Sequence, residues 1–196
     1  MMNDEFDRSF RSKGYALVCG VDEAGRGPLA GPVTAAAVIL PPGIEIEGLN
    51  DSKKLSAKRR ETLYGVITRE AVTWAVAHAA VDEIESLNIL NAAQLAMRRA
   101  VSLLSPAPGL ALVDGNIVRD FPVEAIAVVG GDGKSACIAA ASVLAKVTRD
   151  ALMCELAGVY PQYAFERHKG YPTALHYERL HAFGPCPAHR RSFLKK

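Results

Sequence analysis

The sequence predicts a layered α/β domain, and three observations support this fold class. Short runs rich in Val, Ile and Ala alternate with longer segments that have helical periodicity. The chain has 196 residues, which is enough for one domain with a sizeable core. Hydrophobic residues make up 49% and charged residues 22%. This globular composition excludes a disordered chain, a collagen-like repeat and a disulfide scaffold.

Three strands and one helix are predicted in the first half of the chain. Residues 16–21 and 33–40 are apolar runs that end at two acids and at a Pro-Pro-Gly turn. Residues 56–69 predict a helix, because Ser56 is a suitable N-cap and apolar side chains follow at helical spacing. Residues 71–81 alternate in part and predict a third strand. Since turn-like or helical segments link these strands, we expect at least one antiparallel pair.

The second half predicts two helices and two short strands. Residues 91–104 are rich in Ala and Leu and are followed by two prolines, as is typical of a helix end. The apolar runs 110–113 and 125–129 predict buried strands that end at Asp-Gly and at Gly-Gly-Asp. Residues 134–157 predict a long helix, whose alanines permit close packing on a sheet.

The cysteines and the apolar segments indicate a cytoplasmic, soluble protein. No pair of the four cysteines has the C-x-x-C spacing of a zinc or redox site, so we expect free thiols in a reducing compartment. Residues 1–13 contain several acids and no apolar run, unlike a signal or transit peptide. The run at 33–40 is too short to span a bilayer, so we expect no membrane partner.

Positive charge is concentrated in two segments, although the net charge is only +2. Residues 52–60 contain five Lys or Arg and no acid, and residues 167–196 contain seven against the single acid Glu178. Each segment could be no more than a solvated face. Two basic clusters on an otherwise acidic chain nevertheless favour a polyanionic partner.

Acids are expected directly after the apolar strands. Asp22 and Glu23 follow the first run, and Asp114 and Asp132 follow the two short runs of the second half. Carboxylates at the ends of buried strands are costly unless they are paired or bind a cation, and such ends converge in an α/β sheet. Four oxygen donors without a nearby Cys suit Mg²⁺ or Mn²⁺. The alternative is that Asp114 belongs to a turn and that Asp132 caps the long helix.

Two glycine motifs resemble nucleotide-binding loops, but each lacks a feature that such a loop requires. Residues 25–30 fit G-x-G-x-x-A, but Pro28, Pro32 and a strand-like run stand where the fingerprint needs a helix. Residues 133–135 match the end of a P-loop, but Val128 occupies the place of its first glycine. Neither a dinucleotide site nor a nucleoside triphosphatase is expected.

Other residues beside the acids could contact a nucleic acid. Two of the three residues Gly25, Arg26 and Gly27 lack a Cβ, so their backbone can approach a sugar hydroxyl closely. Tyr171 ends a basic run and either stacks on a base or sugar or belongs to the core. His168, His176, His181 and His189 have no ligand spacing, and we expect helical or surface roles for them.

These motifs together resemble the bacterial ribonuclease HII family. The resemblance covers the chain from about residue 14 to the end, with its blocks in the family's order. The blocks are residues 20–32, 51–56, 113–116, 131–132, 138–142, 145–150, 168–171, 184–185 and 189–193. Gly133 and Pro172 depart from the residues common in the family, and neither departure removes a functional group.

The resemblance implies a ribonuclease H-like three-layer α/β fold with a central mixed five-stranded sheet and a small helical C-terminal segment. It divides the chain into an N-terminal extension (1–13), a catalytic domain (14–159) and a helical segment that covers the substrate (160–196). It implies an endonuclease that cuts the RNA strand of RNA–DNA hybrids and cuts 5′ of single ribonucleotides in duplex DNA. We expect a monomer.

The resemblance also implies a site for two divalent cations, Mg²⁺ or Mn²⁺. The catalytic and metal-binding residues would be Asp22, Glu23, Asp114 and Asp132. The substrate-binding residues would be Gly25, Arg26, Gly27, Ser52, Lys53, Lys54, Ser142 and Tyr171. The rival interpretations are another nuclease of this fold and a hybrid-binding protein without catalysis. Four intact acids argue against the second, because they would weaken the binding of a polyanion.

Overall fold

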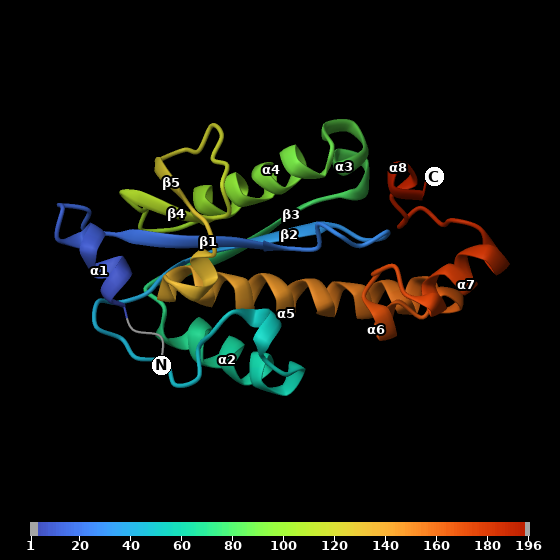
Figure 1. Ribbon diagram of the computed structural model, residues 1–196, viewed down its shortest axis with the longest axis horizontal. Helices are drawn as coiled ribbons and strands as arrows, with labels where there is room; N and C mark the ends of the chain where they lie inside the picture. The colour runs from blue at the N-terminus through green and yellow to red at the C-terminus, as the bar shows by residue number, and fades with distance from the viewer. Residues whose placement is uncertain (1–3, 195–196) are drawn as a thin grey trace.

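A mixed five-stranded sheet forms the centre of the structure, a computed structural model that describes residues 4–194. The strand order is β3-β2-β1-β4-β5 (Figure 1). The strands are β1 (Val18–Ala24), β2 (Val33–Ile39), β3 (Thr73–Ala79), β4 (Leu110–Asp114) and β5 (Glu124–Val128). The first three pair antiparallel, whereas β4 pairs parallel to both β1 and β5. The expected mixed sheet with three antiparallel strands is confirmed.

Helices cover both faces of the sheet (Figure 1). The main helices are α1 (Glu5–Arg11), α2 (Ala57–Glu70), α3 (Val81–Leu87), α4 (Ile89–Ser102), α5 (Ala136–Val159), α6 (Phe165–His168), α7 (Ala174–Phe183) and α8 (Arg191–Leu194). Short 3₁₀ helices are η1 (Ser52–Lys54), η2 (Gly131–Gly133) and η3 (Pro161–Tyr163). α4 packs on one face, and α5 packs on the other with α2 outside it. The three-layer fold is therefore confirmed.

Small residues in the central strands let the helices approach the sheet. Every residue of β2 is buried, with Ala35 and Ala37 facing the α4 side and Ala36 facing α5. Gly20 in β1 lies directly under the start of α5, where a Cβ would overlap the backbone of Cys137. This contact fixes α5 across the strand that carries two of the predicted acids.

The structure corrects three details of the predicted elements. β1 continues to Ala24, so Asp22 and Glu23 lie within the strand and not after it, because pairing with β2 persists to the Ala24–Thr34 pair. An additional helix, α3, precedes α4. Ser135 is the N-cap of α5, and its hydroxyl accepts from the Ile138 amide. Asp132 is therefore not the helix cap.

The N-terminal helix α1 is tied to the start of α5. Asp7 is fully buried, and its carboxylate accepts hydrogen bonds from the Ser135 hydroxyl at 2.5 Å and the Cys137 amide at 3.2 Å. Asp4 accepts from the Gly43 amide and pairs with Arg8 and Arg11. These contacts place charged side chains of α1 where they satisfy backbone donors of the next elements.

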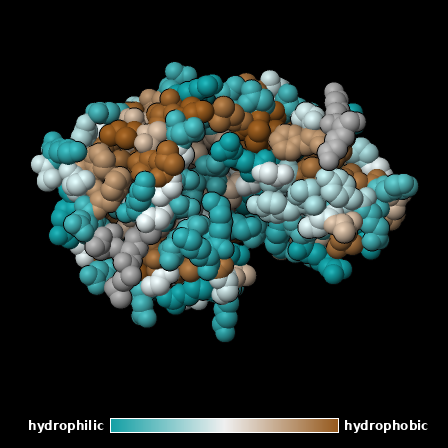
Figure 2. Space-filling view, viewed as in Figure 1, coloured by the Kyte–Doolittle hydropathy of each residue, from teal (hydrophilic) through white to brown (hydrophobic). Residues whose placement is uncertain are grey.

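The C-terminal elements form a small lobe with its own apolar cluster. Met153, Tyr163 and Phe165 are buried together with Ala30 from the loop after β1. Figure 2 shows a hollow between this lobe and the body of the molecule, with mostly hydrophilic walls. Among the helices of residues 4–194, none is both long and apolar enough to cross a membrane.

Three histidines form the centre of this lobe, so the expected surface role is wrong for them, whereas the expected helical role holds for His168 in α6 and His176 in α7. His168, His176 and His189 are at most 7% exposed. The His168 and His176 rings stack at 4.3 Å, and Nε2 of His176 lies 3.0 Å from Nε2 of His189. Burial, together with the neighbouring His176, lowers the pKa of His189 to about 4. No local sequence pattern indicates this cluster, because its members come from three separate segments.

Protonation of His189 should destabilise the fold at mildly acidic pH. The unfolded chain binds this proton near the ordinary pKa of 6.5, whereas folded His189 binds it only near about 4. The contribution of neutral His189 to stability is therefore fully present above pH 6.5 and is lost as the pH falls towards 4. We expect the free energy of unfolding to drop by up to about 2 kcal/mol through this group between pH 7 and pH 5.

Urea unfolding at pH 7 and pH 5 measures this difference. His189→Gln should flatten the pH dependence, whereas the exposed His181→Gln should leave it as in the unaltered chain. The same pH dependence in all three proteins would contradict the prediction.

Candidate metal centre and nucleic-acid site

The register of the sheet brings Asp22 and Asp114 together. The parallel pairing of β1 with β4 ends at Val21 and Val113. The next residue on each strand is an aspartate, so the two carboxylates occupy neighbouring positions where the ladder opens. The Oδ1 atom of Asp114 accepts a hydrogen bond of 2.7 Å from the Gly131 amide, which anchors the segment that carries Asp132.

Asp22, Asp114 and Asp132 form one carboxylate group. Each offers an oxygen atom, and these oxygens lie within 4.8 Å of one another. Asp22 and Asp132 are buried, and Asp114 is half-buried. The structure thus brings together three of the four predicted metal ligands.

The electrostatics of this group fit a divalent cation. Burial, with the negative charges of Glu23 and Asp114, raises the pKa of Asp22 well above its ordinary value. Burial and the Asp114 charge also raise the pKa of Asp132. Buried carboxylates this close together are stabilised by a positive charge between them, and hard oxygen donors are the ligands that Mg²⁺ and Mn²⁺ prefer. The donor set therefore fits the expected ions.

Glu23 lies beside this group but not within it. Its Oε1 atom is 3.3 Å from Nη1 of Arg26, with which it forms an ion pair. Burial raises the pKa of Glu23, and the charge of Arg26 opposes that effect. In the described residues, the carboxylate of the fourth predicted acid is thus held by Arg26 and not by the group of three aspartates.

The turn after β1 carries the predicted sugar-binding residues next to these acids. Gly25 has a φ of +100°, which favours glycine, whereas Arg26 and Gly27 are exposed. A Cβ on Gly27 would lie 3.9 Å from the ring of Tyr171. The structure therefore brings Tyr171 and this turn together, although 144 positions separate Gly27 from Tyr171 in the sequence.

Tyr171 is at the surface and not in the core. Its side chain is 39% exposed, and its ring lies 5.5 Å from Nζ of Lys146 and 5.9 Å from Cζ of Arg149. An exposed aromatic ring flanked by cations can stack on a sugar or a base. The alternative of a core tyrosine is wrong for this structure.

The other predicted substrate-binding residues fall into two groups: buried serines that hold η1 in place, and exposed lysines on its surface. Ser142 is buried in α5, and its hydroxyl accepts from the Ser52 amide at 3.3 Å, so it holds η1 in place. Lys53 and Lys54 of η1 are exposed. Lys53 Nζ lies 3.6 Å from Asp132. Burial by itself lowers the pKa of Lys53, but the nearby carboxylates outweigh this effect and raise it.

Two functional candidates escaped the sequence interpretation. Arg149 and Arg190 are fully buried and donate to backbone carbonyls around the turn after β1. Arg190 contributes to the basic charge of the C-terminal segment and to the block 189–193, but neither pattern indicates that it is buried; the segment is therefore not a uniformly solvated basic face. The pattern of charges along a sequence does not separate a buried arginine from an exposed one.

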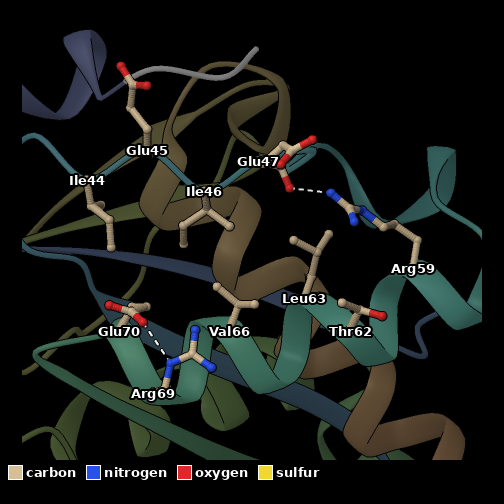
Figure 3. A pocket seen from close by; sticks show the side chains of 10 residues that line it. All are labelled: Ile44, Glu45, Ile46, Glu47, Arg59, Thr62, Leu63, Val66, Arg69 and Glu70. Carbon is tan, nitrogen blue, oxygen red and sulfur yellow. Dashed lines mark hydrogen bonds and ion pairs between the residues drawn. The ribbon is translucent and has the colours of Figure 1, made fainter.

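A further pocket lies away from these residues. It has a volume of about 320 Å³ and is formed between residues 44–47 and α2 (Figure 3). Both arginines that line it are engaged: Arg59 donates to the Glu47 carbonyl, and Arg69 pairs with Glu70 (Figure 3). None of the predicted site residues lines it.

Comparisons with known proteins agree with this fold. The family model described as Ribonuclease HII matches residues 19–196. The protein named Ribonuclease HII from Dechloromonas aromatica (strain RCB) is 60% identical over 177 residues, which are 90% of each chain. The corresponding protein of Idiomarina loihiensis is 56% identical over 177 residues, or 90% of this chain and 95% of that one.

Solved structures share this fold at lower sequence identity. The ribonuclease H2 from Pyrococcus horikoshii OT3 has a TM-score of 0.71 at 26% identity and aligns over 90% of this chain and 93% of that one. The structure titled Bst-RNase HIII in complex with Mn²⁺ shares the fold at a TM-score of 0.59 and 17% identity, over 90% of this chain and 64% of that one. Because the family model spans residues 19–196 and the relatives are 56–60% identical over most of the chain, the chain belongs to the ribonuclease HII family.

Proposed function

We propose that this chain is an endonuclease that hydrolyses the RNA strand of RNA–DNA hybrids and cuts 5′ of single ribonucleotides in duplex DNA. It would act as a monomer in the cytoplasm and use two divalent cations, Mg²⁺ or Mn²⁺. The observation that carries the proposal is the group of Asp22, Asp114 and Asp132, whose oxygens lie within 4.8 Å of one another. In a protein that only bound a hybrid, such a group would weaken the binding, because its negative charges repel phosphates.

The carboxylates of the three aspartates would hold the cations, and Glu23 would join them when its carboxylate leaves Arg26. Bound divalent cations make an attacking water more acidic and neutralise the leaving oxygen of a phosphodiester. Lys53 lies at the edge of the group, where its charge can contact a phosphate next to the one that is cut.

The turn of Gly25, Arg26 and Gly27 would read the sugar. The 2′-hydroxyl is the group that distinguishes a ribonucleotide from a deoxyribonucleotide, and an exposed backbone can bond to it closely. Tyr171, whose ring lies beside Gly27, would pack on the sugar of the following nucleotide. The two contacts together would place the phosphate at such a junction over the carboxylates.

Cleavage of three end-labelled duplexes tests the proposal: an RNA–DNA hybrid, a DNA duplex with one ribonucleotide, and the same duplex without it. We expect metal-dependent cleavage of the first two, with the second cut at one position 5′ of the ribonucleotide. EDTA should abolish both reactions. Cleavage that persists in EDTA, or no cleavage of either ribonucleotide-containing duplex, would overturn the proposal.

Replacing Lys53 and Lys54 with Gln should weaken substrate binding and reduce its dependence on salt. Both side chains are exposed beside the carboxylate group, where they would contact phosphates and release counterions. We expect the slope of log affinity against log salt to fall by about one to two. Lys13→Gln removes one positive charge from the N-terminal segment, outside the predicted site, and should leave the slope unchanged. An unaltered slope in the Lys53/Lys54 variant would mean that these residues form a solvated face only.

A further inference from the structure

Arg190 is a buried cation without an acidic partner among the described residues. Its side chain is fully buried, and its guanidinium donates to four backbone carbonyls at distances between 2.7 and 3.1 Å. The acceptors are the carbonyl oxygens of Gly25, Arg26, Pro28 and Gly31. Burying a cation is costly, so an arrangement in which four carbonyls converge on one requires a reason.

Docking of the C-terminal segment does not supply that reason. The main chain already joins this segment to the loop after β1: the Arg190 amide donates to the Leu29 carbonyl, and the Gly31 amide donates to the Ala188 carbonyl. Residues Ala30 and His189 also form a β-bridge. These bonds involve the backbone and do not need the guanidinium. Two of the four acceptors of the guanidinium, the carbonyls of Gly25 and Arg26, instead belong to the turn that precedes these bonds.

The geometry of the peptide group shows what this engagement does to the turn. The peptide bonds of residues 25–27 are trans, so each carbonyl and the following N–H point in opposite directions. The carbonyls of Gly25 and Arg26 point inward to Arg190. The amides of Arg26 and Gly27 must therefore point away from it. Within residues 4–194, neither amide donates to a protein acceptor.

Two unpaired amides thus face outward, at the exposed end of the turn and beside the ring of Tyr171. Neighbouring backbone N–H groups that point the same way form a site for an oxygen atom with lone pairs. A positive charge buried directly behind them strengthens that site, since it draws electron density along the same peptide dipoles.

We propose that Arg190 is a positioning residue for 2′-hydroxyl recognition, because it holds the amides of Arg26 and Gly27 towards the ribose at the cleavage site. This inference rests on the proposed function. Arg190 does not touch the substrate and acts through the turn. Its removal should therefore lower the preference for a ribonucleotide more than it lowers the affinity for DNA.

Binding in EDTA separates this effect from the chemical step. Fluorescence anisotropy would give the affinity of each protein for two duplexes that differ only in one 2′-hydroxyl. In Arg190→Lys, which keeps the charge but loses the planar fork, we expect the preference for the ribonucleotide to fall by about tenfold, as expected for one or two lost hydrogen bonds. The affinity for the all-DNA duplex should stay within a factor of about two.

Arg11→Lys is the matched control, because Arg11 also donates to a backbone carbonyl, that of Leu40, far from the turn. It should leave the preference unchanged. A folded Arg190→Lys variant with the preference of the unaltered protein would overturn the inference. An unaltered protein that cleaves neither ribonucleotide-containing duplex would instead overturn the proposed function.

A second measurement does not depend on the folding of any variant. The amide resonances of Arg26 and Gly27 in the ¹⁵N-labelled unaltered protein should shift on addition of the ribonucleotide-containing duplex, and shift much less with the all-DNA duplex. Equal shifts with both duplexes, or no shift at either amide, would also overturn the inference.

Discussion

Asp114→Asn should reduce cleavage by about a thousandfold or more while the fold is retained, since a lost ligand charge at a two-metal site costs several kcal/mol of transition-state stabilisation. Asp114 is the last residue of β4 and belongs to the carboxylate group. The substitution removes a negative charge but keeps an Oδ1 atom. Asparagine can therefore still accept the hydrogen bond from the Gly131 amide that fixes η2.

The measurement is kcat/KM on a duplex with one ribonucleotide, together with the thermal midpoint and the affinity for the hybrid. Asp120→Asn is the matched control, because it makes the same change at an exposed loop position with a positive φ. It should cleave at the normal rate. Near-normal turnover of Asp114→Asn, or its failure to fold, would contradict the assignment of Asp114 to the metal site.

Gly25→Ala should lower kcat/KM by about a hundredfold and destabilise the fold by about 2–4 kcal/mol, from overpacking and left-handed backbone strain combined. The φ of Gly25 is +100°, and an added Cβ would overlap the Arg149 side chain. Arg149 cannot move aside cheaply, because it is fully buried and donates to the carbonyls of Ala30, Pro32 and Lys169. The turn itself must therefore shift away from the carboxylate group.

Gly43→Ala separates the clash from the backbone strain. Gly43 also has a positive φ, of +76°, but nothing lies within 4 Å of its added Cβ. We expect this control to lose about 1 kcal/mol of stability and no activity. The two variants would be compared by urea unfolding and by kcat/KM on the single-ribonucleotide duplex. Similar losses of stability and of kcat/KM in both variants would show that the clash with Arg149 does not cause the effect of Gly25→Ala.

The order of elements and most of their bounds could be predicted because they depend on local pattern. The apolar runs at 33–40 and 110–113 match β2 and β4 within one residue, and the helix predicted at 56–69 is α2 with its N-cap at Ser56. The candidate metal-binding acids could be predicted for a related reason. A carboxylate beside a buried strand is unusual enough in sequence to indicate a bound cation.

The sequence by itself thus determined the layered α/β fold, the family resemblance and the acids from which the carboxylate group is built. Only the tertiary structure decided which of those acids converge, because convergence depends on strand register: Asp22 meets Asp114 where the β1–β4 ladder ends, whereas Glu23 turns to Arg26. It also decided that Arg190 and His189 are buried. Burial is set by contacts between segments far apart in the chain, such as 25–31 with 188–190, and no local pattern encodes such contacts.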